Sequence, residues 1–400
     1  MQGANAEGQG DGMRSPVALR AAADRLRPRL LGWRRHLHAH PELSGQERET
    51  AAFIAAELAA LGLQARRPLP NAVVCDLGAP GPRVALRADI DALPIREETG
   101  LPFASSRPGV MHACGHDGHT AILLGVAALL GPEPSVPPLR LIFQPAEEVP
   151  PGGAIDLIAA GVLEDVSAIA GLHLWAPLRS GAAVLAPGPA WAAADRFRAI
   201  ILGRPGHAAE PHAAVDALET ACRAVVGLQS IVSRRVDPLQ PAVVTVGRLQ
   251  AGEAFNVVAG EAVLEGTVRA FDEDVRRHIR AQIGSVLQHA AAAAGARVEL
   301  EYVDGFPPLR NDPEVAAVVA AAAEAQLGPG TVAPGPRAMV ADDFARYAER
   351  VPGAYLQLGA GGATAGLPHH HPRFDIDEDV LPVGAAILAD AALRLAGRRG

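Results

Sequence analysis

Residues 83–89 read RVALRAD, an almost continuous apolar run that ends in Asp89. Similar runs occur at 139–145 (LRLIFQP) and 167–175 (SAIAGLHLW), and helical patterns lie between them at 119–131 and 153–161. Strands that are apolar throughout are typical of parallel sheets buried on both faces. Their alternation with helices predicts an α/β domain in which helices cover both faces of a mixed, mostly parallel sheet.

From about residue 187 the pattern changes to strand, helix, strand, strand, helix, strand, which is the order of a ferredoxin-like α+β unit. The expected strands are 196–203, 241–250, 262–271 and 296–303, and the expected helices are 214–235 and 272–295. We therefore predict an inserted domain at residues 187–300, within a first domain formed by 16–186 and 301–400. Residues 1–15 are polar and rich in glycine, so we expect a flexible tail.

Composition excludes several classes of function. The formal net charge of -8 and the pI of about 6.0 give no reason to expect nucleic acid as a partner. All 36 basic residues are arginine, and without lysine neither a Schiff base nor a P-loop phosphate site can form. The chain has three cysteines, an odd number that lie far apart in the sequence, which fits a reducing cytoplasm. We expect neither a secretory signal nor a membrane span, because charged residues, Gly or Pro interrupt each apolar run.

Polar side chains follow the apolar runs at the points where the expected strands end. Asp89 and Asp91 follow the first run, Glu147 and Glu148 the second, and His173 lies near the end of the third. Because ligands of open parallel sheets bind at the carboxyl ends of the strands, these residues predict a site at one edge of the sheet.

The segment GVMHACGHDGHT, residues 109–120, concentrates ligand-type side chains. In an extended segment Cys114 and His116 point the same way, and thiolate with imidazole suits zinc or a similar divalent metal. Cys114 could instead be a small buried apolar residue, or a redox thiol, although no resolving cysteine lies near it in sequence. We favour Cys114 and His116 as ligands, with His112, Asp117 and His119 supporting the loop.

Two further clusters can be interpreted either as functional residues or as solvated side chains. In FQPAEEVPPGG, one of the two carboxylates could bind metal while the other takes a proton from a metal-bound water, or both could be solvated in a turn. The run His369–His371 could be a solvated tract, or could supply one functional histidine. By contrast, we interpret His36, His38 and His40 as structural cations near a helix C-terminus.

Six motifs occur in a fixed order: LRADIDALPI, GVMHACGHDGHTAILLG, LIFQPAEE, GHAAEPH, EGTVRAF and HHPRFDIDE. On these motifs the chain resembles amidohydrolases of the aminoacylase, hippurate hydrolase and auxin-conjugate hydrolase group, in the co-catalytic di-metal exopeptidase superfamily. The resemblance covers nearly the whole chain after the tail. It implies a di-metal catalytic domain and an inserted lid that also forms a homodimer.

The resemblance also implies roles for single residues. Two divalent ions, of zinc, manganese, cobalt or nickel, would be held by Cys114, His116, Glu148, His173 and His370. Glu147 matches the general base, and Asp91 matches a carboxylate that orients a ligand.

In the lid, His207 matches a histidine that reaches the partner subunit's site and stabilises the oxyanion. Asn256 and Arg269 resemble residues that bind the substrate carboxylate, and Gly361, within 359–362, could let a substrate backbone approach. Two motifs depart from the pattern of the group, because 256–259 read NVVA instead of NVIP and 342–344 read DDF instead of EDF.

The expected reaction is hydrolysis of the amide bond of an N-acyl amino acid to a carboxylic acid and a free amino acid. A metallo-exopeptidase, either a dipeptidase or a carboxypeptidase, is the nearest alternative because it uses the same chemistry. A binding protein that has lost catalysis is a more distant one, and the complete set of ligand-type residues argues against it.

Overall fold

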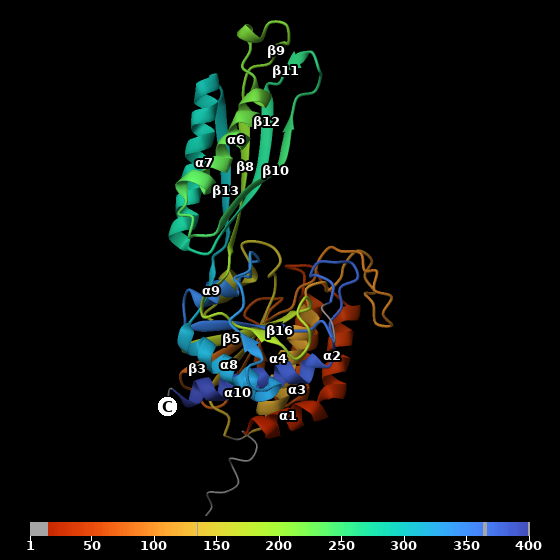
Figure 1. The fold of residues 1–400 in the computed structure, drawn as a ribbon. Coiled ribbons are helices and arrows are strands. Elements are labelled where there is room, and N and C mark those ends of the chain that lie inside the picture. The colour runs from red at the N-terminus through yellow and green to blue at the C-terminus, as the bar shows by residue number, and fades with distance from the viewer. Residues whose placement is uncertain (1–14, 134, 363–365, 399–400) are drawn as a thin grey trace, which may run out of the picture. The chain divides into compact units, whose positions relative to one another are not determined.

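The computed structural model describes residues 15–133, 135–362 and 366–398, and the chain divides into two units (Figure 1). Unit 1 comprises the chain up to Gly188 together with Arg310–Pro336 and Asp343 onward. Unit 2 comprises Pro189–Leu309 and Arg337–Asp342. It therefore runs past the predicted end at residue 300, because the strand Arg297–Phe306, which spans that position, pairs within the sheet of unit 2. Of the predicted tail, residues 1–14 lie outside the described part of the chain.

Unit 1 contains a mixed sheet whose strand order is β1-β2-β4-β3-β5-β16-β6-β15. The strands are β1 (Ala65–Arg66), β2 (Val73–Leu77), β3 (Arg83–Asp89), β4 (Leu139–Gln144), β5 (Val166–Trp175), β6 (Ala183–Val184), β15 (Val332–Ala333) and β16 (Gly353–Gly359). The central strands β4, β3, β5 and β16 are parallel neighbours, whereas β2 pairs antiparallel with β4. The central strands are buried almost throughout, as their apolar sequences predict.

Helices cover both faces of this sheet. They are α1 (Pro16–Arg25), α2 (Arg27–Ala39), α3 (Arg48–Ala60), α4 (His116–Leu130), α5 (Gly153–Ala159), α8 (Pro313–Leu327), α9 (Phe344–Ala348) and α10 (Val380–Gly397). Helix α10 packs against α4 and α8, while α9 contacts α5 and β16. Figure 1 shows α9 and α10 on opposite sides of the sheet, so the predicted α/β class is confirmed.

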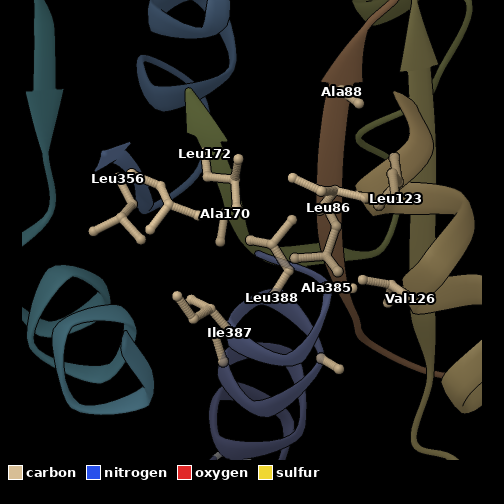
Figure 2. Packing of buried hydrophobic residues seen from close by; sticks show 14 of the residues in the cluster. Leu86, Ala88, Leu123, Val126, Ala170, Leu172, Leu356, Ala385, Ile387 and Leu388 are labelled. Atoms are coloured by element: carbon tan, nitrogen blue, oxygen red, sulfur yellow. The ribbon is translucent and has the colours of Figure 1, made fainter. Parts of the chain in front are cut away.

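The core of unit 1 lies between β3, β5 and β16 and helices α4 and α10. Leu86, Ala170 and Leu356 of the sheet face Ile387 and Leu388 of α10 (Figure 2). Helix α10 is long and apolar enough by composition to cross a membrane, contrary to the expectation that no run reaches that length. However, 78% of the helix is buried inside the protein, so its apolar composition is accounted for by contacts on nearly all of its sides.

Unit 2 has a four-stranded antiparallel sheet of order β10-β12-β8-β13, with two helices packed on it. Its elements are β8 (Ala193–Leu202), α6 (Ala217–Arg235), β10 (Ala242–Ala251), β12 (Glu261–Ala270), α7 (Glu273–Ala294) and β13 (Arg297–Phe306). Buried and exposed residues alternate along β8, as expected for a sheet with one covered face. The side chains of Asp216 and Asp272 cap α6 and α7. Order and connections match the predicted ferredoxin-like unit.

Shorter elements complete the chain. They are β7 (Gly188–Trp191), β9 (Gly206–His207), the 3-10 helix η2 (Pro211–Ala213), β11 (Val257–Val258) and β14 (Leu309–Asn311). Strands β9 and β11 form a small antiparallel ribbon within unit 2.

Candidate metal centre

Four segments of unit 1 meet at the carboxyl edge of its parallel strands. Asp91 follows β3, Glu147 and Glu148 follow β4, and His173 lies near the end of β5. The loop before α4 brings Cys114, and His116 is the first residue of that helix. Because β4, β3 and β5 are adjacent and parallel, their ends lie side by side, as the sequence predicts.

Ligand atoms of the predicted residues cluster at this edge. Three overlapping groups each have atoms within 4.8 Å of one another: Cys114, His116 and His173; Cys114, Glu148 and His370; and His116, Glu147 and Glu148. Cys114 Sγ lies 3.6 Å from His173 Nε2, and Glu148 Oε1 lies 3.3 Å from His370 Nε2. The structure thus brings together all five predicted ligands and the predicted base.

Hydrogen bonds fix which nitrogen of each histidine faces the cluster. His116 Nδ1 lies 2.9 Å from Asp91 O and 3.2 Å from Asp91 Oδ1, which leaves Nε2 directed toward Glu148. His173 Nδ1 lies 3.0 Å from Leu174 O and Nε2 faces Cys114. An imidazole whose Nδ1–H donates to a carboxylate or carbonyl presents Nε2 as a ligand atom.

Two buried atoms of the cluster lack hydrogen-bond partners among the described residues. They are His116 Nε2 and Glu148 Oε1, which are 3.8 Å apart. Buried polar atoms in proteins are nearly always paired, so an imidazole nitrogen and a carboxylate oxygen facing each other without a bond require an explanation. A cation between them satisfies both, and the sulfur, nitrogen and oxygen donors present fit a divalent transition metal.

The electrostatics of the cluster also favour a cation. Burial and then the carboxylates of Glu148 and Glu147 raise the pKa of the Cys114 thiol well above its usual range. Burial alone would lower the pKa of His116, but the carboxylates of Asp89 and Asp91 raise it to about 10. Cys114 can therefore act as a thiolate only beside added positive charge, which a bound metal provides.

Asp91 holds two parts of the cluster together. Besides orienting His116, its Oδ2 accepts hydrogen bonds from Ser44 Oγ at 2.7 Å and from the backbone N–H of Glu148 at 3.0 Å. Burial raises the pKa of Asp91, but the hydrogen bond and charge of His116, followed by these two bonds, hold it below its usual value. The geometry matches the orienting role that the sequence predicts for Asp91.

His370 reaches the cluster from the loop before α10. Its backbone has φ of 63°, and its N–H donates to Ala113 O at 2.8 Å, next to Cys114. Its neighbour His369 instead lies 3.0 Å from Leu174 O through Nε2. His370 is thus the histidine of the 369–371 run that faces Glu148, as expected.

The supporting histidines of the opening loop differ from each other. His119 has a hydrogen-bond partner at each ring nitrogen, since Nδ1 lies 2.6 Å from Asp89 Oδ1 and Nε2 accepts from Leu174 N–H at 2.8 Å. It therefore supports the loop and is not a ligand. His112 is buried, and burial lowers its pKa to about 4. Neither ring nitrogen of His112 has a hydrogen-bond partner in the part of the chain that the structure describes.

His38 is a structural cation in the last turn of α2, as the sequence predicts, but nothing in the sequence indicated its partners. Its ring is fully buried and Nδ1 lies 2.8 Å from Asp117 Oδ2. Burial opposes its charge, but hydrogen bonds to Asp117 and Glu97 raise its pKa to about 9. Arg34, one turn earlier in α2, donates to the same Asp117 oxygen at 3.0 Å, so α2 is joined to the first turn of α4 by a buried ion network.

Sequence reasoning also missed Glu47 and underestimated Asp343. Glu47 is fully buried, and its Oε1 accepts from the backbone N–H of Ala146 at 2.7 Å. Asp343, from the altered DDF motif, is a buried anchor that accepts from Arg87, Gln144 and the N–H of Ala154. Neither contact has a local sequence signal, because Ala146 and the partners of Asp343 lie far away along the chain.

Gly361 makes a backbone contact within unit 1, since its N–H donates to Leu178 O at 2.9 Å. Two residues earlier, a Cβ on Gly359 would meet Arg179 O at 2.0 Å. The close approach of chain that requires glycine at 359 is therefore internal to the protein.

The predicted lid residues of unit 2 lie in two separate places, with His207 and Asn256 together and Arg269 apart from them. His207 on β9 pairs in register with Val257 on β11, and the carbonyl of Asn256 accepts from Ala208 N–H. Arg269 lies near the far end of β12, eight positions after Glu261, and its register partner on β8 is Ala194. Eight strand residues span about 26 Å, so Arg269 and the β9–β11 ribbon are too far apart to contact one small substrate within one chain.

Comparison with known proteins agrees with this geometry. Residues 85–394 match the model of peptidase family M20/M25/M40. The chain is 43% identical over 376 residues to an N-acetyl-L-cysteine deacetylase of Bacillus subtilis (92% of this chain, 89% of the relative). It is 45% identical over 298 residues to an N-acyl-L-amino acid amidohydrolase of Geobacillus stearothermophilus (73% and 80%).

Solved structures show the same fold. The Bacillus subtilis YXEP protein, described as a dinuclear metal binding peptidase from the M20 family, superposes with a TM-score of 0.81 at 36% identity. The match covers 94% of this chain and 99% of that one. The chain therefore belongs to peptidase family M20/M25/M40.

Proposed function

We propose that this protein hydrolyses the amide bond of N-acyl amino acids, releasing a carboxylic acid and a free amino acid. The observation that carries the proposal is the cluster of five ligand-type side chains with a further buried carboxylate, Glu147, beside it. The class of substrate follows from relatives at 43–45% identity that are named as a deacetylase and an amidohydrolase of N-acyl amino acids.

Cys114, His116, Glu148, His173 and His370 would hold two divalent metal ions. Zinc, manganese, cobalt and nickel are all compatible with this mixture of sulfur, nitrogen and oxygen donors. When bound, such a pair supplies positive charge that activates water and polarises the amide carbonyl. Asp91 contributes by fixing the His116 ring with Nε2 toward the cluster.

Glu147 is the general base and acid of the proposed reaction. Its carboxylate is 5% exposed and has an oxygen within 4.8 Å of ligand atoms of His116 and Glu148. It takes a proton from the attacking water and delivers that proton to the leaving amide nitrogen. The hydrogen bond from the backbone N–H of Glu148 to Asp91 holds the chain next to Glu147 in place for both transfers.

His207, Asn256 and Arg269 would complete the site in a homodimer formed through unit 2. We assign the oxyanion to His207 and the substrate carboxylate to Asn256 and Arg269. The separation of the β9–β11 ribbon from Arg269 supports this arrangement, since both could reach one substrate only if they came from different copies of the chain.

A substrate panel tests the proposal. Protein loaded separately with each of the four metals is assayed for kcat/KM on N-acetyl amino acids, N-benzoyl amino acids and unblocked dipeptides. We expect turnover of the acylated amino acids, and kcat/KM for dipeptides at least ten times lower. Preference for dipeptides would instead identify a metallo-exopeptidase, and a metal-loaded protein without turnover on any of them would contradict a hydrolytic function.

A further inference from the structure

The backbone around Glu147 has an unusual conformation. Ala146, just before the base, has φ of 54°, a region that residues other than glycine seldom adopt. Its carbonyl accepts from Gly153 N–H at 2.9 Å, and Gly153 admits no side chain because a Cβ there would meet Pro145 O at 2.0 Å. Such a conformation persists only where surrounding contacts enforce it, and it occurs often at active sites.

Two buried carboxylates contact the backbone on either side of Glu147. The N–H of Glu148, after the base, donates to Asp91 at 3.0 Å, and the N–H of Ala146, before it, donates to Glu47 at 2.7 Å. The segment 44–47 is involved in both contacts. Ser44 donates a hydrogen bond to Asp91, and Glu47 supplies the second carboxylate. The contact to Asp91 follows from its predicted role, but the contact to Glu47 has no assigned purpose.

The side chain of Glu47 is not used by its own helix. Glu47 is the N-cap residue of α3, a position where short polar side chains normally bond the first N–H groups of the helix, yet it makes no capping bond. Instead Oε1 accepts from Gly45 N–H at 2.9 Å as well as from Ala146, and Oε2 accepts from Asn71 Nδ2 at 2.8 Å. The carboxylate is therefore held rigidly with one lone pair directed at the loop that carries the base.

We propose that Glu47 is a positioning residue that fixes the proton-transfer geometry of Glu147 by holding the N–H of Ala146. A hydrogen bond from a backbone N–H to a buried carboxylate is charge-assisted and stronger than one to a neutral acceptor. Without it, Ala146 relaxes toward an ordinary φ and the Glu147 carboxylate moves away from the water and the leaving nitrogen. Displacement of a catalytic group by about 1 Å can lower the rate about 100-fold.

Glu47→Gln tests this role, which rests on the proposed function because it takes Glu147 as the base. We expect kcat to fall about 10- to 100-fold, with KM, metal content and metal affinity in a chelator competition close to those of the wild type. Asn71→Ala removes only the hydrogen bond to Glu47 Oε2 and leaves the bond to Ala146, so the loss of kcat should be smaller. Glu49→Gln is the matched control, since Glu49 lies on the same helix but is exposed and pairs with Arg107.

A double-mutant cycle separates positioning from a general structural effect. If Glu47 acts through Glu147, adding Glu47→Gln to a Glu147→Gln protein should lower the residual activity by less than twofold. Equal losses of activity in both backgrounds, or a kcat of Glu47→Gln within twofold of the wild type, would overturn the proposal. So would a loss of kcat that parallels a loss of metal.

Amide hydrogen exchange gives a readout that needs no substrate. Exchange of the Ala146 amide should accelerate at least tenfold in Glu47→Gln and remain unchanged in Glu49→Gln, whereas the Glu148 amide, held by Asp91, should stay protected. If the wild type hydrolysed none of the acylated amino acids, the proposed function would fail, and this exchange measurement would still decide whether Glu47 holds the loop. An unchanged Ala146 amide would refute the proposal in either case.

Discussion

Units 1 and 2 differ in how close their candidate functional residues lie to one another. In unit 1, five ligand-type side chains and the proposed base come from several separate segments and converge within overlapping groups of 4.8 Å. In unit 2, His207 and Arg269 lie toward opposite ends of the long strand β12, about 26 Å apart along the sheet. Unit 1 therefore brings the residues of the proposed metal centre together within one chain, whereas the roles proposed for the residues of unit 2 require a second copy.

The largest effect is expected in unit 1, at the base. Glu147→Gln keeps the size and position of the side chain but cannot accept a proton, so kcat should fall about 10²- to 10⁴-fold. Metal content, measured by elemental analysis of the purified protein, should stay at the wild-type value because the proposed ligands are intact.

Glu164→Gln, an exposed carboxylate in the same unit, serves as control and should retain full activity. Turnover of Glu147→Gln within tenfold of the wild type would show that another group moves the proton.

The next effect concerns His207 and would test the difference between the units directly. His207→Ala should lower kcat about 10²- to 10³-fold, as expected for loss of an oxyanion donor. A heterodimer of His207→Ala with Glu147→Gln, purified through two different affinity tags, should recover about half of the wild-type activity per dimer. One of its two sites then combines an intact Glu147 with an intact His207 of the other copy.

His212→Ala, at an exposed histidine in η2, is the matched control. It should be active without being combined with a complementing variant. A heterodimer no more active than its two parent variants would mean that His207 does not serve the other subunit.

A smaller effect is expected for the residue that orients a ligand. Asp91→Asn keeps the shape of the side chain but weakens its hold on His116 and on the Glu148 N–H, so metal affinity should fall about 10- to 100-fold. Competition with a chelator measures this, and the exposed Asp156→Asn is the control. Unchanged affinity in Asp91→Asn would show that packing alone holds His116 in place.

The unit 1 cluster could be predicted because its residues obey local rules. Cys114 and His116 lie two positions apart where the chain enters α4, and the carboxylates directly follow apolar strands whose parallel pairing fixes where they end. Glu47 could not be found in this way, because it and its partner Ala146 are 99 positions apart and meet only through packing. For the same reason the topology of unit 2 was predictable but the positions of its functional residues relative to a substrate were not.

The partners of His38 were missed for a different reason. Arg34 and His38 are four positions apart on α2 and therefore lie on one face of the helix, which is a signal for a shared partner. That partner, Asp117, was assigned to the same loop as the metal ligands, but nothing local connects it with α2. The buried network joining α2 to α4 leads to a prediction about stability and not about catalysis.

The smallest predicted effect changes stability and leaves activity unchanged. It again compares the two units, this time by the pH dependence of their buried charge networks. The folded-state pKa of His38 is about 9, above its ordinary value of 6.5, because Asp117 and Glu97 face the ring, while Arg34 opposes them. The stability from its charge is therefore complete below pH 6.5 and is lost as the pH rises through 9, and it amounts to about 3 kcal/mol. In unit 2 the corresponding buried network joins Asp195 to Arg276 and Tyr302. Asp195 raises the pKa of Arg276 in spite of its burial, and burial together with Asp195 raises the pKa of Tyr302.

Urea unfolding of metal-loaded wild type and His38→Gln at pH 6.5 and pH 10 tests this difference. The variant should lose on the order of 3 kcal/mol more at pH 6.5 than at pH 10, because at pH 10 the wild-type ring has also lost its charge. His278→Gln, exposed on α7 in unit 2, should show no pH-dependent change. A penalty for His38→Gln that is equal at both pH values would mean that the ring stabilises unit 1 by packing alone, and that this unit carries no more charge-dependent stability in this range than unit 2 does.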